Sequence, residues 1–338
     1  MSPSAQGPAE RPWSGTGHHR GVVDTMVLGG TGYVGRHVCA VLAGLGQEVL
    51  AVGRDPAKAL PGLPFAALDR DDALDRLLTA VRPRTVVNCA GGVWEVSDEE
   101  MLGSNVSLVE RLLAALERLD RPPRLVHLGS AHEYGAVPYG TRTSESLTPS
   151  PLTAYGRAKL RSTRMVRAAF EAGVLDGAVL RLSNVLGPGA PPSSLLGAVV
   201  RSLRRARASG GTALLPLAAP YAYRDFVDAR DVAAAIAAAA AGRPAARVLN
   251  IGGGTPVPVR RVMERLIAIS GTPAEIVERT GGPQTRDNGD WQQLDITVAQ
   301  EVLGWAPRYA LTDSLAWSWE PHSRSSGPGP RDEEGHPG

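Results

Sequence analysis

The chain has 338 residues, of which 43% are hydrophobic and 5% aromatic, and its formal net charge is +2 at pH 7. This length allows one large α/β unit or two domains that share a core, and the core must be aliphatic. The balanced charge, without a concentrated basic stripe, excludes a typical nucleic-acid-binding protein. No apolar run of transmembrane length and no signal-peptide core are visible, so we expect a cytoplasmic protein with no membrane partner.

Cysteine, histidine and lysine usage narrows the chemistry further. The two cysteines, Cys39 and Cys89, cannot form the disulfide framework of so large a fold, and we expect two buried, inert thiols. The adjacent His18 and His19 lie in a polar tail, and no metal site is expected. Only two of the 36 basic residues are lysines, so a lysine in this chain stands out.

Short aliphatic runs alternate with helical patterns through the first half of the chain. The expected strands are residues 25–30, 47–53, 65–69, 85–92, 124–130 and 177–185. The expected helices are residues 33–46, 71–81, 98–119 and 153–173. Strands and helices that alternate at this spacing predict an α/β fold with a Rossmann-type, doubly wound parallel sheet.

The alternation loosens after Gly187, where several prolines interrupt the pattern. We therefore expect a Rossmann-type domain, a smaller mixed α/β lobe and two disordered tails. The predicted boundaries are 21–185 for the Rossmann domain, with 222–250 returning to it, 186–221 and 251–320 for the lobe, and 1–20 and 321–338 for the tails.

Three glycines, Gly29, Gly32 and Gly35, lie in "GGTGYVG" between the first expected strand and the helix after it. Glycine permits the tight turn, the close approach of a pyrophosphate and close packing of helix on strand. The free N–H groups at the helix start favour the same anion. In this strand–turn–helix context the motif predicts a dinucleotide site.

Tyr155 and Lys159 lie four residues apart in "YGRAK" and share one side of an expected helix. An ammonium near a phenol favours the phenolate, so such a phenol can exchange a proton with a carbonyl or alcohol oxygen. Ser130 ends the strand before this helix, at the sheet edge where doubly wound folds place their sites. Its hydroxyl could bond the same oxygen.

Together these elements resemble the extended short-chain dehydrogenase/reductase family of nucleotide-sugar epimerases, dehydratases and reductases. The resemblance spans residues 25–315, and the region around "GSAHEYG" is most similar to 4-ketoreductases of nucleotide-linked 4-keto-6-deoxyhexoses. Further matching segments are "NCAGG" (88–92), "NVSLVERLL" (105–113), "RLSNVLGPG" (181–189), "YRDFVDARDVA" (223–233), "LNIGGGTPV" (249–257) and "LGWAP" (303–307).

The resemblance implies roles by position. Ser130, Tyr155 and Lys159 would form the catalytic triad. The implied substrate contacts are His132, Asn184 and Arg224, with Asn184 and Arg224 on the pyrophosphate. The implied cofactor contacts are Gly29, Thr31, Gly32, Tyr33, Val34, Arg54, Asp69, Ala90, Gly91, Asn105, Tyr155 and Lys159.

The same resemblance implies a homodimer. Members of the family usually pair the helices at 98–119 and 153–173 with those of a second subunit in a four-helix contact. Both helices carry apolar residues beyond one sheet-facing stripe, such as Leu112, Leu116, Met165 and Phe170.

Arg54, at the tip of the second expected strand, favours NADP(H) because a guanidinium suits a 2′-phosphate. The alternative is that Asp55 turns inward and binds a bare 2′-hydroxyl. A coenzyme released at each turnover implies an NADPH-dependent reductase. The resemblance, rather than the coenzyme, implies the substrate, which is the C4 keto group of a nucleotide-linked, dTDP-type 4-keto-6-deoxy sugar, in deoxysugar biosynthesis for a natural product.

Three other functions are weighed against this reductase. Ala131 and His132 stand where dehydratases of the family carry an Asp-Glu pair, which argues against dehydration. A nucleotide-sugar 4-epimerase with tightly bound NAD stays open. An NADP-sensing regulator on the same fold is less favoured, because such proteins tend to lose the Tyr or the Lys that this chain keeps. His132 is the rival to Tyr155 as the acid, because its free pKa suits proton transfer.

Overall fold

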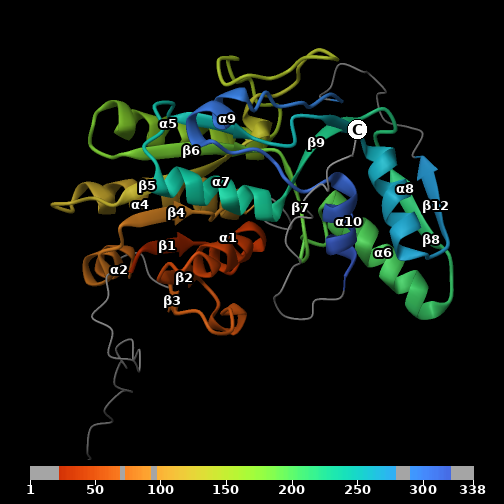
Figure 1. The fold of residues 1–338 in the computed structure, drawn as a ribbon, viewed down its shortest axis with the longest axis horizontal. Helices are drawn as coiled ribbons and strands as arrows, with labels where there is room; N and C mark the ends of the chain where they lie inside the picture. The colour runs from red at the N-terminus through yellow and green to blue at the C-terminus, as the bar shows by residue number, and fades with distance from the viewer. Residues whose placement is uncertain (1–22, 69–72, 93–96, 279–289, 321–338) are drawn as a thin grey trace, which may run out of the picture.

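The computed structural model describes residues 23–68, 73–92, 97–278 and 290–320. Its centre is a seven-stranded sheet of order β10-β6-β5-β4-β1-β2-β3, in which every pairing is parallel (Figure 1). These strands are β1 (Thr25–Leu28), β2 (Val49–Gly53), β3 (Phe65–Ala67), β4 (Thr85–Asn88), β5 (Arg124–Ser130), β6 (Gly177–Leu182) and β10 (Val248–Ile251). The predicted doubly wound parallel sheet is confirmed. The strand order reverses between β1 and β4, which is where such folds bind ligands.

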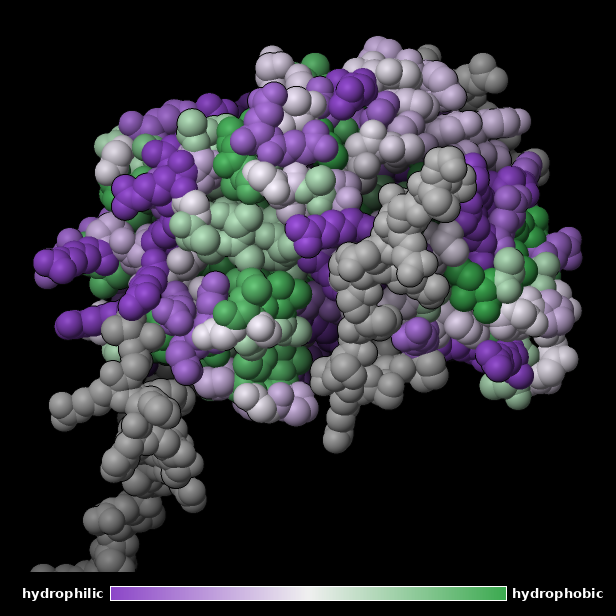
Figure 2. All heavy atoms as spheres, viewed as in Figure 1, coloured by the Kyte–Doolittle hydropathy of each residue, from purple (hydrophilic) through white to green (hydrophobic). Residues whose placement is uncertain are grey.

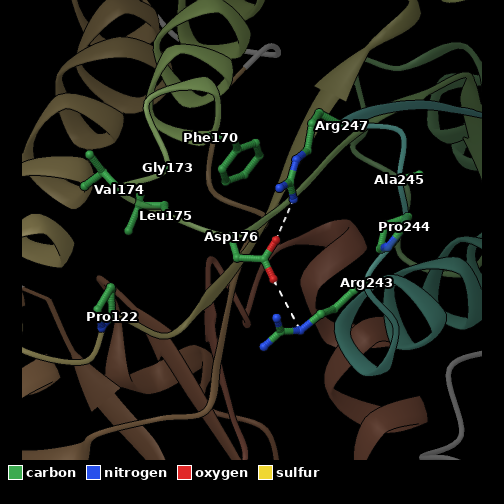
Figure 3. Close-up of a pocket in the computed structure, with 10 residues that line it drawn as sticks. All are labelled: Pro122, Phe170, Gly173, Val174, Leu175, Asp176, Arg243, Pro244, Ala245 and Arg247. Carbon is green, nitrogen blue, oxygen red and sulfur yellow. Dashed lines mark hydrogen bonds and ion pairs between the residues drawn. The ribbon is translucent and has the colours of Figure 1, made fainter.

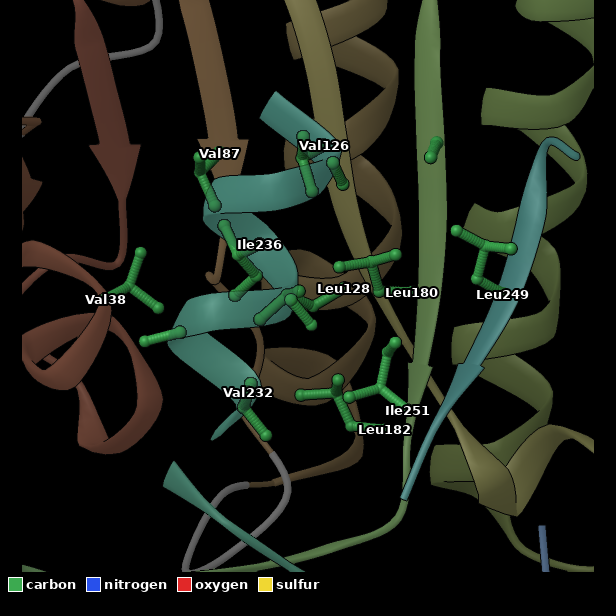
Figure 4. Packing of buried hydrophobic residues seen from close by; sticks show 14 of the residues in the cluster. Val38, Val87, Val126, Leu128, Leu180, Leu182, Val232, Ile236, Leu249 and Ile251 are labelled. Carbon is green, nitrogen blue, oxygen red and sulfur yellow. The ribbon is translucent and has the colours of Figure 1, made fainter. Parts of the chain in front are cut away.

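Helices cover both faces of the sheet, and successive strand residues serve opposite faces. Val27 packs toward α1 (Tyr33–Gly44) and α7 (Ala229–Ala241), whereas Met26 and Leu28 pack toward the other face. The helices on that face are α2 (Ala73–Val81), α4 (Leu108–Glu117) and α5 (Ala154–Glu171). Figure 4 shows α7 across the strands, with Val232 and Ile236 among Val126, Leu128 and Leu180. Each such buried side chain contributes about 1.5–3 kcal/mol.

A third core lies beside the sheet and belongs to the C-terminal lobe (Figure 1). Its helices are α6 (Leu195–Ser209), α8 (Val259–Ser270) and α10 (Leu311–Trp319), and α9 (Thr297–Leu303) packs near β10. Two small sheets complete it: β11-β9-β7 and β12-β8. Their strands are β7 (Asn184–Leu186), β8 (Ala213–Leu217), β9 (Tyr223–Asp228), β11 (Pro256–Pro258) and β12 (Ala274–Glu278).

Two expected elements differ from the structure. The strand expected at 177–185 is two strands, because the chain leaves the main sheet after β6 and pairs as β7 with β9. The helix expected at 98–119 is α3 (Asp98–Leu102), a π-helical turn η2 (Gly103–Ser107) and then α4. Within residues 222–250, β9 joins the small sheet while α7 and β10 pack in the main domain.

A pocket of about 480 Å³ lies at the amino ends of the strands (Figure 3). Asp176, just before β6, accepts hydrogen bonds from Arg124 (2.7 Å) and Arg247 (2.5 Å), and Arg243 lies 3.8 Å away. Arg124 begins β5 and Arg247 precedes β10, so these ion pairs tie three neighbouring strands together. Ligands of doubly wound sheets bind at the opposite, carboxyl ends.

The surface in Figure 2 is hydrophobic mainly over α1 and the alanine-rich α7, and polar side chains cover much of the rest of this face. Within the described ranges, none of the helices combines the length and hydrophobicity that crossing a membrane requires.

The residues chosen as signs of a four-helix dimer contact belong to the core. Leu112 and Leu116 are fully buried, Phe170 is 4% exposed, and Met165 packs against the same cluster. The expectation that these residues lie beyond the sheet-facing stripe of each helix is wrong, because both helices pack a broad face against the sheet. The homodimer stays a prediction that these side chains do not support.

Leu112→Ala should lower the free energy of unfolding by about 2–5 kcal/mol, because the substitution leaves a cavity in a closed core. Urea unfolding followed by circular dichroism measures this change. The matched control is Leu102→Ala on α3, where the side chain is 51% exposed and the expected change is within about 0.5 kcal/mol. Equal effects of the two substitutions would contradict the packing described here.

Candidate active site

The glycine-rich turn leaves the start of α1 open. Gly29 has a φ of +72°, and a Cβ on Gly35 would lie 2.1 Å from the Gly29 carbonyl oxygen. Gly32 occupies the N-cap position, where no side chain caps the helix, and the first turn has no acidic residue. The first N–H groups of α1 are therefore available to an anion such as a pyrophosphate.

Two other predicted cofactor residues in this turn use their side chains elsewhere. The Tyr33 hydroxyl donates to the carbonyl oxygens of Val185 (3.1 Å) and Gly187 (3.3 Å). Val34 packs against the core on the α1 face of the sheet. Both residues remain in the first turn of α1, so their contribution to a dinucleotide site would come from the backbone.

The tip of β2 presents Arg54 to solvent and turns Asp55 away. Asp55 Oδ1 accepts from the Ala57 N–H at 3.0 Å and so caps the short 3₁₀ turn η1 (Pro56–Lys58), and Lys58 lies 3.9 Å away. The side chain of Thr31 covers the same strand end, since a Cβ on Gly53 would lie 2.7 Å from its hydroxyl. Asp69 lies outside the described residues.

The loop after β4 adjoins an unsatisfied acceptor. Asn105, on the π-helical turn, donates from Nδ2 to the carbonyls of Gly92 (2.8 Å) and Met101 (2.9 Å), while its buried Oδ1 has no hydrogen-bond partner among the described residues. A Cβ on Gly91 would lie 2.4 Å from this Oδ1 and 3.1 Å from Lys159 Nζ. Only glycine at position 91 leaves room for these two side chains, so Asn105 Oδ1 and Lys159 Nζ both lie against the Gly91 backbone.

Ala90 is fixed on the same loop by the side chain of Asn88, whose Oδ1 accepts from the Ala90 N–H at 3.1 Å. Ala90 also lies directly against the glycine turn: a Cβ on Gly29 would be 2.8 Å from the Ala90 nitrogen. Gly29 therefore could not carry a side chain at this contact. Two loops that are about 60 residues apart in the sequence thus pack against each other where the strand order of the sheet reverses.

Ser130, Tyr155 and Lys159 come together at the carboxyl end of β5. Burial raises the pKa of Tyr155 to about 12, although a hydrogen bond with Ser130 lowers it in part. Burial lowers the pKa of Lys159 to about 8, and its Nζ donates to the Leu128 carbonyl at 2.9 Å. At neutral pH the phenol is therefore a proton donor and the amine an ammonium.

His132 and Arg224 lie beside this group. The His132 ring meets the Tyr155 ring edge to face at 5.7 Å, and burial together with the charge of Arg224 lowers the pKa of His132. Arg224 comes from β9, so the lobe contributes a guanidinium next to the predicted acid. Its Nη1 donates to the Tyr223 carbonyl at 2.9 Å.

Asn184 is bound within the lobe. Its Nδ2 donates to the Asp225 carbonyl (2.8 Å) and to Gln292 Oε1 (2.5 Å). Both amide protons are thus used by the protein, and contact with a pyrophosphate would require this amide to exchange partners.

Sequence reasoning missed Glu133 and Arg181, which form a buried ion pair directly behind Ser130. Glu133 is fully buried and Arg181 is 2% exposed, and Nε of Arg181 donates to Oε2 at 2.8 Å. The available signal was an arginine in the aliphatic run of β6 and a glutamate after Ser130. Because this carboxylate is fully bonded and closed to solvent, it does not replace the acids that dehydratases carry at the preceding positions.

The two thiols are free in the structure: Cys39 is buried and Cys89 half-buried. Burial raises the pKa of Cys39 to about 12 and that of Cys89 further, so both are protonated at neutral pH. In the part of the chain that the structure describes, no three His, Cys, Asp or Glu side chains are grouped as a metal ion requires.

The fold and the open glycine turn define a dinucleotide-binding enzyme fold, and comparison with known proteins identifies the family. Residues 25–252 match the profile of the NAD dependent epimerase/dehydratase family. The chain therefore belongs to this family, as its resemblance to the extended short-chain dehydrogenase/reductases predicts.

Individual relatives cover nearly the whole chain. It is 45% identical over 313 residues to a dTDP-6-deoxy-L-talose 4-dehydrogenase (NAD(P)(+)) of Kitasatospora kifunensis. This alignment covers 91% of the present chain and 98% of the Kitasatospora protein. MoeE5, solved in complex with UDP-glucose and NAD, is 29% identical with a TM-score of 0.74, and covers 88% of this chain and 97% of its own. A UDP-glucose 4-epimerase of Thermotoga maritima shares the fold at 24% identity, with a TM-score of 0.76 and the same coverage of 88% and 97%.

Gly35→Ala should weaken the binding of a nicotinamide dinucleotide and lower the unfolding free energy by about 1–3 kcal/mol, because the new methyl group forces α1 away from the Gly29 carbonyl. Fluorescence titration with the reduced dinucleotide and urea unfolding measure the two effects. Gly44→Ala in the same helix is the control: nothing lies within 4 Å of its added Cβ. It should leave binding unchanged and stabilise by about 0.4–1 kcal/mol. A Gly35→Ala variant that binds like wild type would show that the turn does not hold the dinucleotide.

Proposed function

We propose that this protein is an NADPH-dependent reductase that converts the C4 keto group of a nucleotide-linked 4-keto-6-deoxy sugar into an alcohol in deoxysugar biosynthesis. The observation that carries the proposal is the contact of the Tyr155 ring with the His132 ring at 5.7 Å, next to Ser130, with the charge of Arg224 acting on His132. These groups support Tyr155 as the proton donor to a sugar oxygen and Arg224 as a partner for a phosphate.

The relative of 45% identity supports this choice of carbon and nucleotide. Its name describes a 4-dehydrogenase of a dTDP-linked 6-deoxy sugar. Oxidation of a C4 alcohol and reduction of a C4 ketone are the two directions of one reaction. We therefore propose a dTDP sugar as the substrate and C4 as the reacting carbon.

The residues of this chain supply the proton and the electrostatic support. When bound, a reduced nicotinamide supplies the hydride that becomes the new C4–H bond. Tyr155 gives its phenolic proton to the C4 oxygen as the C=O π bond is lost, and Ser130 bonds the same oxygen. Lys159, one helical turn further on, stabilises the resulting phenolate by its positive charge.

The cofactor would be held at the start of α1, by Asn105 and Lys159, and by Arg54. The N–H groups at the start of α1 suit the pyrophosphate, and Lys159 Nζ, together with the acceptor Asn105 Oδ1, would bond the hydroxyls of the nicotinamide ribose. Exposed Arg54 suits a 2′-phosphate, while Asp55 is engaged in capping its own turn. These contacts favour NADPH over NADH.

A direct absorbance assay tests the proposed function. Loss of reduced-nicotinamide absorbance is followed with NADPH and with NADH, using dTDP- and GDP-linked 4-keto-6-deoxy sugars. The proposal expects NADPH oxidation with a dTDP-linked substrate. Purification with NAD firmly bound, together with interconversion of C4 epimers without net NADPH oxidation, would instead identify a nucleotide-sugar 4-epimerase.

Arg54→Ala should raise the KM for NADPH about ten- to a hundredfold and barely change that for NADH, because one charge-assisted contact to the 2′-phosphate is lost. Steady-state kinetics with both coenzymes measure the shift. Asp55→Asn is the matched change at the neighbouring position and should leave both values near wild type. If Asp55→Asn selectively weakens NADH, the carboxylate binds the ribose and the coenzyme assignment is wrong.

Tyr155→Phe should lower turnover about a hundredfold or more while NADPH binding stays near wild type, since the ring is retained and only the transferable proton is lost. Lys159→Arg should also lose turnover, because the larger guanidinium does not fit beside Gly91. Turnover and coenzyme titration are measured in parallel. If Tyr155→Phe keeps most of its turnover and His132→Asn loses it, then His132 is the acid.

A further inference from the structure

Glu133 is a carboxylate with no exposed surface, and the mechanism above gives it no role. Its Oε1 accepts from the Ser130 N–H and from the Thr163 hydroxyl, each at 2.9 Å, and its Oε2 accepts from Arg181 at 2.8 Å. It therefore joins the corner after β5 to α5 and β6. Desolvation can cancel the gain from a buried ion pair, so stability alone does not explain a charge at this place.

The Glu133 carboxylate and the Lys159 ammonium contact one short stretch of β5. Lys159 Nζ donates to the carbonyl of Leu128. On the next residue, Gly129, a Cβ would lie 2.6 Å from Glu133 Oε1, so only glycine leaves room for the carboxylate. Thr163, which bonds the same oxygen, lies one turn beyond Lys159 on α5. The two opposite charges thus share one buried corner, where Coulomb attraction is strong.

Among the residues that the structure describes, the other groups near Lys159 provide no comparable negative charge. Cys89 is a neutral thiol because burial raises its pKa, and the pKa of His127 falls well below its usual value because of burial and the charge of Lys159. Asn105 is uncharged. By contrast, the negative charge of Glu133 raises the pKa of Lys159 against the effect of burial.

Polar and charged groups also lie around Tyr155 and Arg181, the two other residues that interact with Glu133. Tyr155 faces Ser130, the ring of His132 and the charge of Glu133, and Arg224 lies beyond His132. Arg181 is the counter-ion of Glu133, lies 4.6 Å from the centre of the Tyr134 ring and is near Glu145.

We propose that Glu133 is a positioning residue: its carboxylate fixes Ser130 against α5 and supplies the negative charge that keeps Lys159 an ammonium. The catalytic consequence rests on the function proposed above, whereas the effect on Lys159 does not. Glu133 also disfavours a negative charge on Tyr155, so it favours the protonated, proton-donating form of the phenol that a reductase requires. Arg181 and Thr163 hold the carboxylate in place.

The chain itself makes the charge of Lys159 measurable, because it contains only two lysines. Labelling with 13C at lysine Cε gives two resonances, and exposed Lys58 serves as the internal reference. The pH titration of the wild-type protein should give a midpoint near 8 for Lys159. Lys159→Arg assigns the signal.

Glu133→Gln keeps an oxygen acceptor for Ser130 and removes the charge. The Lys159 midpoint should fall by about one pH unit or more, which is about a tenfold or greater loss of ammonium at a given pH above the midpoint. Glu133→Asp keeps the charge on a shorter side chain, so the midpoint should stay near the wild-type value. Glu145→Gln is the matched control, since it removes a carboxylate near Arg181 that does not act on Lys159, and should leave the midpoint unchanged.

A second variant keeps the proposal testable if Glu133→Gln misfolds. Misfolding is a risk because Glu133→Gln leaves Arg181 buried without its counter-ion. Glu133→Gln/Arg181→Met removes both buried charges, and the Lys159 midpoint should fall in it as well. A midpoint equal to that of wild type in a folded Glu133→Gln protein, or in the folded double variant, overturns the proposal and leaves Glu133 a purely structural residue.

The pH dependence of kcat/KM links this charge to the reaction. Because the Lys159 ammonium is lost as pH rises through its pKa, the reductase activity should fall above about pH 8. In Glu133→Gln this alkaline fall should begin about one unit lower, and Glu133→Asp should restore its position. Absence of turnover in the wild type with every 4-keto sugar would reject the proposed function, while the lysine titration would still decide the role of Glu133.

Discussion

The contact between α1 and the carbonyl of Gly29 constrains much of this structure. With a hydrogen in place of a side chain at Gly35, the helix lies directly on the turn that precedes it, and its uncapped start is held over the end of β1. The same close approach brings Tyr33 within hydrogen-bond distance of Val185 and Gly187, and His37 within 3.1 Å of the Pro188 carbonyl. One tight helix–strand contact therefore both opens an anion site and anchors the chain where it leaves the main sheet.

The joint between the sheet and the lobe is built around Arg230. Its guanidinium donates twice to Asp228, the N-cap of α7, and lies between the rings of Tyr309 (3.5 Å) and Trp317 (4.0 Å). Trp317 also contacts His37 of α1. Since β9 directly precedes this joint, the position of Arg224 beside His132 depends on how the lobe is fastened to the main domain. The proposed substrate contact of Arg224 and the packing of the lobe on the main domain are thus linked through one short segment.

Burial shapes the chemistry of the site by opposing the charged form of both central groups. It raises the pKa of Tyr155 to about 12 and lowers that of Lys159 to about 8. An isolated buried ammonium would be unfavourable, but it is balanced by the Leu128 carbonyl and the charge of Glu133. The result is a neutral acid beside a cation, which suits proton donation to a ketone. A carboxylate held away from the reacting oxygen can thus influence the reaction without contacting it.

The local order of the sequence determined the fold class and the main motifs. Alternating strands and helices predict the parallel sheet, and residues close in sequence, such as Gly29 with Gly35 or Tyr155 with Lys159, keep their relation in any strand–turn–helix or helix. Only the tertiary structure decided that Asp55 caps its own turn, that Leu112 faces the core, that Asn105 lies on a π-helical turn, and that Glu133 meets Arg181 across 48 residues. The reason is physical: hydrophobic periodicity and turn geometry act over a few residues, whereas the partner of a buried charge and the face that a helix buries depend on segments that folding brings together from distant parts of the chain.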